Sequence, residues 1–362
     1  MTLPDARDIK RIDCLLLGEI GDAIVCTPTL QALRQQYPAA RLTLIARPMV
    51  ASLFAASQLA DEILLFKAQT IWQKAAFLLK LRRRRCDLWV DLQAPTFNTF
   101  GSDAWIYRRN ALLMRAARSR YRLGFAVTAL KPQLTHAVPL PAPEVLRTEN
   151  MVDTTLRLLG DTSTQARPDK QISVAAADQA WATQWWSEHH AAEERVLGLF
   201  FGAKQSAKFW PQPNIVEFIS LWLAAAANHR ILLLGGPHEV LQGAAVMASL
   251  PAVQASRVTN TIGATSLGQL AALMQRCAVI VSTDSGPMHI ADALARPLVA
   301  LMSYHNHPAI WRPVSTHATV LNHPVDCGPC LRDTCDHGNE CMRRISAAEV
   351  LQRVESLLAE EA

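Results

Sequence analysis

The chain has 362 residues, of which half are hydrophobic and 19% are charged, and its formal net charge is +5. This composition is typical of a soluble globular protein, and the length predicts two domains rather than one. No apolar run reaches the roughly 18 residues that a membrane span requires. Asp5, Asp8 and Asp13 interrupt the N-terminal segment where a secretory signal would be basic and then apolar, so we expect a cytoplasmic protein.

The first fifty residues predict a parallel sheet covered by helices. Apolar runs at 12–17 and 42–46 predict strands, and the helical pattern at 23–37 completes a strand–helix–strand unit. The turn at 18–22 (GEIGD) contains two glycines, whereas a dinucleotide-binding turn needs three in the order G-x-G-x-x-G. An NAD-dependent enzyme is therefore disfavoured.

Arginine-rich segments mark the N-terminal half. Arg82–Arg85 end an expected helix over 72–81, where they either complement the negative helix end or meet an anionic membrane surface or phosphate-rich partner. Further arginines follow closely, at Arg108, Arg109, Arg115, Arg118, Arg120 and Arg122. Because Arg binds phosphate in a bidentate manner and no recognisable nucleic-acid module accompanies the run, an acidic substrate is favoured over DNA or RNA.

The strand-and-helix pattern restarts near residue 196 and predicts a second α/β domain. Strands expected at 196–201, 231–234 and 278–281 each end in a polar loop, and ligands of such sheets bind at the carboxyl ends of the strands. The third loop, Ser282–Pro287, leads into a helical pattern whose free amides and dipole favour an anion. An ordinary strand–helix turn that binds no ligand is the alternative.

Four short motifs occur in an order that is known from one family. They are Gly21-Asp22 with Thr27-Pro28, Leu33-Arg34 and Tyr37-Pro38; Gly202-Ala203 with Lys208-Phe209-Trp210-Pro211; Gly236-Pro237 with Glu239; and Asp284-Ser285-Gly286-Pro287-Met288-His289-Ile290-Ala291. In these motifs the chain resembles glycosyltransferase family 9, the ADP-heptose:lipopolysaccharide heptosyltransferases, over nearly its whole length. The resemblance implies the α/β GT-B fold, in which two Rossmann-like domains face each other across a cleft.

The resemblance also implies how the two substrates are distributed. It places the acceptor in an N-terminal domain, expected at 1–170, and the nucleotide-sugar donor in a C-terminal domain, expected at 190–344. A capping-box motif at Ser346–Glu349 begins a final helix within 345–362. We expect this helix to pack on one of the domains, with packing back on the N-terminal domain as one option.

Sugar transfer from a nucleotide diphosphate needs a base for the acceptor hydroxyl and positive charge for the leaving diphosphate. The resemblance implies that Asp22 is the base, and an Asp that only stabilises a helix N-terminus is the alternative. We expect the phosphates and acidic sugars of the acceptor to meet the N-terminal arginines, in particular Arg108, Arg109, Arg118, Arg120 and Arg122.

The implied donor site lies in the loops of the second domain. Lys208 matches the family's diphosphate-binding lysine, with Lys204 in the same loop, and Glu239 lies at a strand end where a carboxylate can accept both ribose hydroxyls. Asp284 is expected to bind hydroxyls of the donor sugar. The diphosphate is expected to be held by His289 and by the amides of Ser285, Gly286 and Met288. The alternatives are a surface lysine at 208, a helix-start Glu at 239 and a helix-terminal His at 289.

The eight cysteines fall into two groups. Four are scattered in apolar settings and are expected to be buried. The others crowd together near His323 and His337, at Cys327, Cys330, Cys335 and Cys341. This density suits a structural metal, with free or redox-labile thiols as the alternative. No cofactor is expected in catalysis, because the D-x-D motif of metal-dependent sugar transferases is absent.

The resulting hypothesis is an inverting glycosyltransferase that moves heptose from ADP-heptose to a phosphorylated lipopolysaccharide-core acceptor. It predicts a cytoplasmic protein in peripheral contact with the inner membrane, and no nucleic-acid partner. One alternative within the family uses another nucleotide sugar or a protein acceptor. Alternatives from other classes are a catalytically idle binding protein that kept the fold, and a nucleic-acid-binding metalloprotein built on the cysteine cluster and basic runs.

Overall fold

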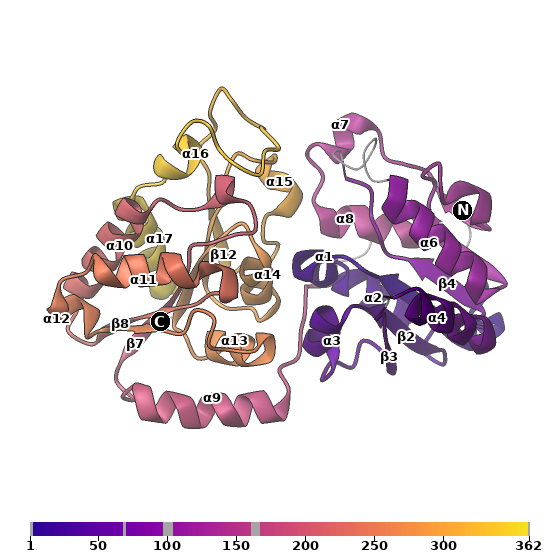
Figure 1. Cartoon of the computed structure of the whole chain (residues 1–362), viewed down its shortest axis with the longest axis horizontal. Helices are drawn as coiled ribbons and strands as arrows, with labels where there is room; N and C mark the ends of the chain where they lie inside the picture. Colours follow the sequence, from indigo (N-terminus) through magenta and orange to yellow (C-terminus); the bar gives the residue numbers. More distant parts are fainter. Residues whose placement is uncertain (1–2, 68–69, 97–103, 161–166, 361–362) are drawn as a thin grey trace. The chain divides into compact units, whose positions relative to one another are not determined.

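The computed structural model describes residues 3–67, 70–96, 104–160 and 167–360 of the chain (Figure 1). It consists of two compact units, Met1–Ser173 and Val174–Ala362, and each contains one sheet of six parallel strands. In the described part of the chain, no helix combines the length and the apolar character that crossing a membrane requires.

The sheet of the first unit has the strand order β3-β2-β1-β4-β5-β6. Its strands are β1 (Arg11–Leu16), β2 (Arg41–Ala46), β3 (Glu62–Leu65), β4 (Leu88–Asp91), β5 (Tyr121–Phe125) and β6 (His136–Val138). Its helices are α1 (Ile20–Val25), α2 (Thr27–Gln36), α3 (Pro48–Phe54), α4 (Ile71–Arg84), α6 (Ala104–Ala117), α7 (Pro143–Leu146) and α8 (Met151–Leu156). The residues of β1, β2 and β4 are almost all buried, because a parallel sheet is covered on both faces. This burial explains the continuous apolar runs from which the strands are predicted.

The helix expected over 23–37 is two helices, α1 and α2, which meet at Cys26. Pro28 explains the break, since proline is tolerated in the first turn of a helix but not in its interior. The break gives α1 its own N-terminus, and Asp22 lies in the first turn of that short helix.

The sheet of the second unit has the strand order β12-β11-β10-β7-β8-β9. Its strands are β7 (Arg195–Phe200), β8 (His229–Leu233), β9 (Val258–Asn260), β10 (Val279–Thr283), β11 (Leu298–Leu301) and β12 (Ala318–Leu321). Its helices are α9 (Ala176–His189), α10 (Gln212–Ala225), α11 (Val240–Ala248), α12 (Ala252–Ala255), α13 (Leu267–Met274), α14 (Gly286–Ala293), α15 (Pro308–Trp311), α16 (Glu340–Arg343) and α17 (Ala347–Glu360), with the 3₁₀ turns η4 (Ser206–Lys208) and η5 (Pro237–Glu239).

Both units follow the 3-2-1-4-5-6 strand order of a Rossmann sheet when each is numbered from its own first strand. The winding direction reverses between the first and fourth strands, which are β1 and β4 in one unit and β7 and β10 in the other. Ligands of such sheets bind outside the carboxyl ends of the strands at this switch point. The residues that follow these four strands therefore define where a site is expected in each unit.

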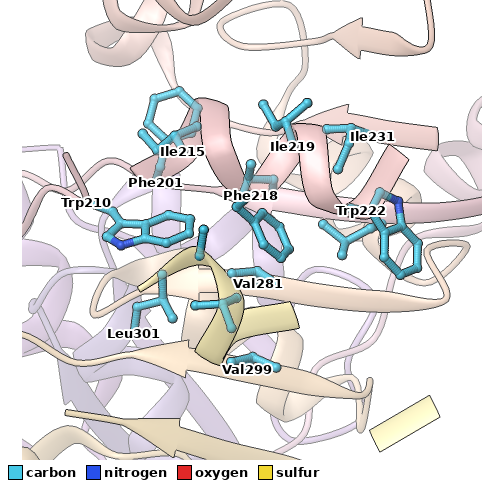
Figure 2. Packing of buried hydrophobic residues seen from close by; sticks show 14 of the residues in the cluster. Phe201, Trp210, Ile215, Phe218, Ile219, Trp222, Ile231, Val281, Val299 and Leu301 are labelled. Atoms are coloured by element: carbon cyan, nitrogen blue, oxygen red, sulfur yellow. The ribbon is translucent and has the colours of Figure 1, made fainter. Parts of the chain in front are cut away.

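A cluster of large apolar side chains forms the core of the second unit (Figure 2). The rings of Trp210 and Phe218 have centroids 5.7 Å apart, and both belong to a cluster with Val281 and Leu301 of the sheet. Burying a side chain such as Phe218 contributes about 1.5–3 kcal/mol. Trp210 Nε1 also donates to the carbonyl of Ile345 at 3.0 Å. This hydrogen bond fixes the loop after β7 at Trp210, two residues after Lys208.

The C-terminal helix α17 belongs to this same core. Its apolar residues Val350, Val354 and Leu357 are buried, and the helix packs on α10 and β11. This corrects the option that the helix packs back on the N-terminal domain, since its apolar face covers α10 instead. The division after Ser173 also places α9, which lay outside the expected domain limits, in the second unit, where it packs against α13.

Candidate functional site

The loops after β7 and β10 bring two opposite charges together at the switch point of the second sheet. Lys208 ends η4, and Asp284 directly follows β10. Lys208 Nζ lies 2.8 Å from Asp284 Oδ2, and the two residues are only 9% and 5% exposed. Both charges are shielded from water, so each depends on the other for neutralisation. The sequence predicts a separate ligand role for each of these two residues, whereas the structure pairs them with each other. Lys204, in the same loop, is exposed.

A histidine that none of the sequence motifs includes lies near this pair. His305 is 6% exposed, and burial together with the charge of Lys208 lowers its pKa. Its imidazole is therefore neutral near pH 7. Its Nδ1 has no hydrogen-bond partner among the residues that the structure describes, which is unusual for a buried polar atom. The only signal in the sequence is its place four residues after the apolar run 298–301, at the same edge of the sheet.

Glu239 is held at this edge by the loop after β8. It ends η5, is 8% exposed, and accepts a hydrogen bond from Gly236 N at 2.9 Å through Oε2. Burial raises the pKa of this carboxyl. A Cβ at position 202 would lie 2.4 Å from Glu239 Cγ, so Gly202 is required there. The Gly202 carbonyl also accepts a hydrogen bond from Thr283 Oγ1, at the end of β10. Gly202 follows β7 and lies against Glu239, which follows β8, so the ends of these three strands lie close together.

The start of α14 completes this site. Ser285 is the N-cap residue, and the first amides of a helix have no partner within it and favour an anion. The amide of Met288 differs, because it donates to the Ser285 carbonyl at 3.1 Å, and the Met288 side chain is fully buried. Ser285 and Gly286 are partly exposed at the turn. His289 is buried and lies edge-on to Trp311, with ring centroids 5.9 Å apart.

In the first unit, Asp22 lies just after β1, at that sheet's switch point. Its Oδ2 accepts a hydrogen bond from Glu19 N at 2.8 Å, which forms a capping box at the start of α1. A Cβ at position 18 would lie 2.7 Å from that oxygen, so Gly18 leaves the space that the carboxylate occupies. The carboxylate is partly exposed. Asp22 therefore caps the helix and also lies at the edge of the sheet where a substrate is expected.

Two like charges lie near the carboxyl ends of β2 and β4 in the same unit. Arg47 directly follows β2, and burial together with the charge of Arg47 lowers the pKa of Arg109, on α6. Arg109 Nη2 donates to Asn110 Oδ1 at 2.9 Å, and the guanidinium lies 5.3 Å from the centroid of the Trp105 ring. Among the described carboxylates, none forms an ion pair with Arg109, and Arg47 has only Glu19 at 3.5 Å. The charge of Asp91 offsets that of Arg109 in part. Two neighbouring guanidiniums nevertheless attract an anion.

The other arginines of the basic runs differ from Arg109 in their bonding and exposure. Arg122 donates to the carbonyls of Ser119, at 2.7 Å, and of Gln133, so it binds the chain itself. Arg84 is held in an ion pair with Glu62 at 2.7 Å. The remaining candidates are exposed, namely Arg108, Arg118 and Arg120. Sequence reasoning missed Arg47, because its only signal is its position immediately after a predicted strand.

Asp91, the last residue of β4, provides a pH-dependent stability prediction. Burial raises the pKa of this carboxyl to about 6, from an ordinary value of 3.8. The folded state therefore holds the proton more tightly than the unfolded state, and the free energy of unfolding falls as pH rises from about 4 to about 6. Asp91→Asn removes the ionised form and is expected to raise the free energy of unfolding by about 1–3 kcal/mol at pH 8.

The Asp91→Asn measurement is chemical denaturation at a series of pH values. The gain of the variant is expected to shrink as pH falls below 6, because the wild-type carboxyl is then neutral as well. Asp8→Asn, at an exposed carboxylate of the same unit, is the matched control. A gain that is the same at every pH would contradict the role of ionisation.

The structure gives no support for a metal site at the four clustered cysteines in the part of the chain that it describes. All are free thiols, and no group of three or more His, Cys, Asp or Glu side chains in the described ranges could hold a metal ion. Cys341 is buried, whereas Cys327 is exposed. Cys335 Sγ accepts hydrogen bonds from the backbone instead, and His323 Nε2 lies 2.9 Å from Glu349 Oε2 on α17. The expected structural metal is therefore unsupported, because the described residues offer no group of three or more suitable ligands.

Solved structures share this architecture over nearly the whole chain. A glycosyl transferase family 9 protein from Veillonella parvula is 22% identical and has a TM-score of 0.81, covering 98% of each chain. The ADP-heptose LPS heptosyltransferase II of E. coli is 23% identical with a TM-score of 0.79, covering 97% of this chain and 99% of that one. Two Rossmann sheets with polar residues at their switch points place this chain in the GT-B class of glycosyltransferase folds, as expected.

The family model of glycosyltransferase family 9 (heptosyltransferase) matches residues 77–340. The chain therefore belongs to this family. It is also similar to lipopolysaccharide heptosyltransferase 2 of Salmonella typhimurium, at 32% identity over 47% of this chain and 49% of that protein. The chain thus spans about half the length of the first curated relatives that it matches. With lipopolysaccharide heptosyltransferase 3 of E. coli the identity is 24%, over 93% of this chain and 96% of that protein.

Proposed function

We propose that this chain is an inverting glycosyltransferase that transfers heptose from ADP-heptose to a phosphorylated acceptor of the lipopolysaccharide inner core. The observation that carries the proposal is the buried Lys208–Asp284 pair, which lies at a switch point beside the start of α14. Family membership and the names of the relatives support it. Structures of E. coli heptosyltransferase WaaC with ADP and with ADP-2-deoxy-2-fluoro heptose have the same fold, with TM-scores of 0.70 and 0.67.

Under this proposal the second unit binds the donor. Lys208 contacts the diphosphate, and Asp284 orients that lysine and accepts hydroxyls of the heptose. Glu239 accepts the ribose hydroxyls, because its carboxylate is held at the end of β8 by Gly236 N. The diphosphate is further held at the start of α14 by Ser285, Gly286 and His289, while Met288 supports the turn through its amide. Lys204, which is exposed, adds positive charge to the same loop.

The proposed step is a single displacement. The acceptor hydroxyl oxygen attacks the anomeric carbon, Asp22 takes up the hydroxyl proton, and the bond between that carbon and the diphosphate oxygen breaks. ADP leaves with the electron pair of that bond, and Lys208 and the α14 amides neutralise its charge. Because attack occurs opposite the leaving group, the configuration inverts. We propose that the chain's own residues stabilise this charge and that the step needs no cofactor.

The acceptor is proposed to bind the first unit. Arg47 and Arg109 suit a phosphate or an acidic sugar, because their charges act on each other and no described carboxylate forms an ion pair with Arg109. The exposed Arg108, Arg118 and Arg120 suit further phosphates at the solvent side, and Arg122 keeps the segment between β5 and β6 in place. Since the acceptor is anchored in a lipid, we place the reaction in the cytoplasm, in peripheral contact with the inner membrane.

The donor prediction is tested by thermal shift with ADP, UDP and GDP, followed by transfer assays with ADP-heptose. ADP at a hundred times its Kd is expected to raise the Tm by about 5–10 °C, and the other nucleotides far less. Glu239→Gln is expected to reduce the ADP effect, whereas Glu217→Gln, on the neighbouring α10, serves as the control. Equal stabilisation by UDP or GDP would favour another nucleotide sugar. The absence of hydrolysis or transfer with every donor would favour a non-catalytic binding protein.

A further inference from the structure

The outer sides of α4 and α6 form a surface that the sheet core does not use and that shares only exposed arginines with the proposed acceptor site. The two helices lie against each other in the first unit (Figure 1). Their inner sides supply Phe77, Leu81, Leu113 and Met114 to the core of that unit. The core is therefore complete without the side chains on the outer sides, which need a separate explanation.

Large apolar side chains project into water from both helices. Trp72 is 81% exposed, Ile71 75% and Trp105 67%, and Leu79 and Leu112 are also exposed. Trp72 and Leu79 on α4 are seven residues apart, as are Trp105 and Leu112 on α6, so each pair lies on one side of its helix. Several large exposed apolar side chains on two neighbouring helices mark an interaction site, unlike a single exposed side chain.

The charge of the same surface has one sign. The segments 71–86 and 104–122 contain no Asp or Glu. Their exposed cations are Lys74, Lys80, Arg82, Arg83, Arg85, Arg108, Arg115, Arg118 and Arg120. We call these cations and the five exposed apolar residues the α4–α6 face. A surface that joins exposed Trp, Ile and Leu with many cations and no anions complements a negatively charged lipid bilayer.

We propose that the α4–α6 face docks this protein on an anionic membrane, with the two tryptophans at the level of the lipid headgroups. The cations contact lipid phosphates, and Ile71, Leu79 and Leu112 enter the boundary of the acyl chains. The inference deepens the proposed function, because it names the surface by which the enzyme reaches a lipid-anchored acceptor. Trp105 supports this connection, since its ring contacts Arg109 of the proposed acceptor site.

A nucleic acid is the competing occupant of a basic surface, and the observations disfavour it. Nucleic acid binds through phosphate contacts and base stacking, for which exposed aliphatic side chains provide nothing. Ile71, Leu79 and Leu112 lie on the same helices as the cations, and the apolar phase of a bilayer would cover them, which a nucleic acid would not. Binding to nucleic acid is nevertheless measured in the test below as an opposing outcome.

The test is flotation of the full chain with vesicles that contain no lipopolysaccharide acceptor. Binding is expected to vesicles of phosphatidylethanolamine with phosphatidylglycerol, to weaken with salt, and to be much weaker to phosphatidylcholine alone. Ile71→Gln with Trp72→Gln is expected to lower the partition coefficient at least about 100-fold, since burying each of the two side chains is worth about tenfold or more. Lys80→Glu with Arg82→Glu and Arg83→Glu is expected to lower it by more than about 100-fold, at about fivefold per cation removed.

Matched controls come from the second unit. Leu241→Gln with Val253→Gln changes two equally exposed apolar side chains, and Arg343→Glu with Arg353→Glu reverses two exposed charges. These variants are expected to float like the wild type. Thermal melts confirm that every variant is folded, and transfer to a water-soluble, delipidated acceptor is expected to stay within about twofold of the wild type, because the substituted side chains are exposed and outside the core.

The outcomes separate this inference from the proposed function. Failure of the wild type to float with anionic vesicles overturns the docking inference, and so does equal loss in the α4–α6 and control variants. Tighter binding to generic RNA or DNA than to vesicles overturns it in favour of a nucleic-acid surface. If vesicle binding behaves as expected but neither the wild type nor any variant transfers sugar to any acceptor, the docking inference stands and the proposed function fails.

Discussion

Asp22→Asn is expected to lower kcat for sugar transfer by about 10²- to 10⁴-fold, which is the contribution of a positioned general base. The amide cannot take up the proton of the acceptor hydroxyl as the oxygen attacks. It can still accept the hydrogen bond from Glu19 N that caps α1, because the amide oxygen replaces Oδ2. The helix cap is therefore preserved, and the free energy of unfolding is expected to change by no more than about 1 kcal/mol.

Because Asp22→Asn removes proton uptake but preserves the helix cap, it is a decisive test of the role assigned to Asp22. The measurement is the steady-state rate with ADP-heptose and a core acceptor, together with a thermal melt. Glu19→Gln is the matched control, because it changes the neighbouring exposed carboxylate, 3.5 Å from Arg47, and is expected to retain most of the activity. A folded Asp22→Asn protein that transfers sugar near the wild-type rate would show that Asp22 serves only the helix.

Lys208→Met is expected to have the second large effect, with kcat/KM lower by about 10²- to 10³-fold, which is the typical loss when one group that stabilises developing charge is removed. The same substitution leaves Asp284 buried without its partner. Breaking a buried pair in this way costs about 3–5 kcal/mol of stability. A loss of activity alone would therefore not distinguish a donor-binding lysine from a purely structural one.

The double variant Lys208→Met with Asp284→Asn resolves this ambiguity. Removing both charges is expected to restore most of the free energy of unfolding, because no uncompensated charge then stays buried. Transfer and ADP affinity are expected to stay low. Lys204→Met, at the exposed lysine of the same loop, is the control and is expected to have the smaller effect. Recovery of transfer in the double variant would leave the pair with a structural role only.

The two units use the same topology to present opposite chemistry. Behind β7 and β10 the switch point of the second sheet presents Lys208, the α14 amides and the neutral His305, which suit a leaving diphosphate. Behind β1 the first sheet presents the carboxylate of Asp22, which suits a proton. The backbone arrangement is common to both units, so the division of roles comes from the side chains in the loops.

Much of the fold is predictable from local sequence. The strands are apolar runs, because both faces of each parallel sheet are covered, and repetition of the strand–helix pattern indicates two Rossmann-like domains. Boundaries are less predictable: one apparent helix over 23–37 is two, since the helical periodicity continues across the break that Pro28 imposes. The C-terminal helix has a recognisable cap and an apolar face, but the partner of that face is α10, more than a hundred residues earlier.

The sequence by itself determined the family, the class of fold and the loops in which the candidate functional residues lie, because motifs and periodicity are local. Only the tertiary structure decided which of these residues lie close together. Lys208 pairs with Asp284 across 76 positions of the chain, Arg47 meets Arg109 and His305 joins the pair, because parallel strands bring distant loops to one edge of a sheet. Among the described residues the same packing brings no three candidate metal ligands together at the clustered cysteines, and it leaves the α4–α6 face exposed. Spacing in the sequence reveals neither outcome, since both depend on where side chains point after the chain has folded.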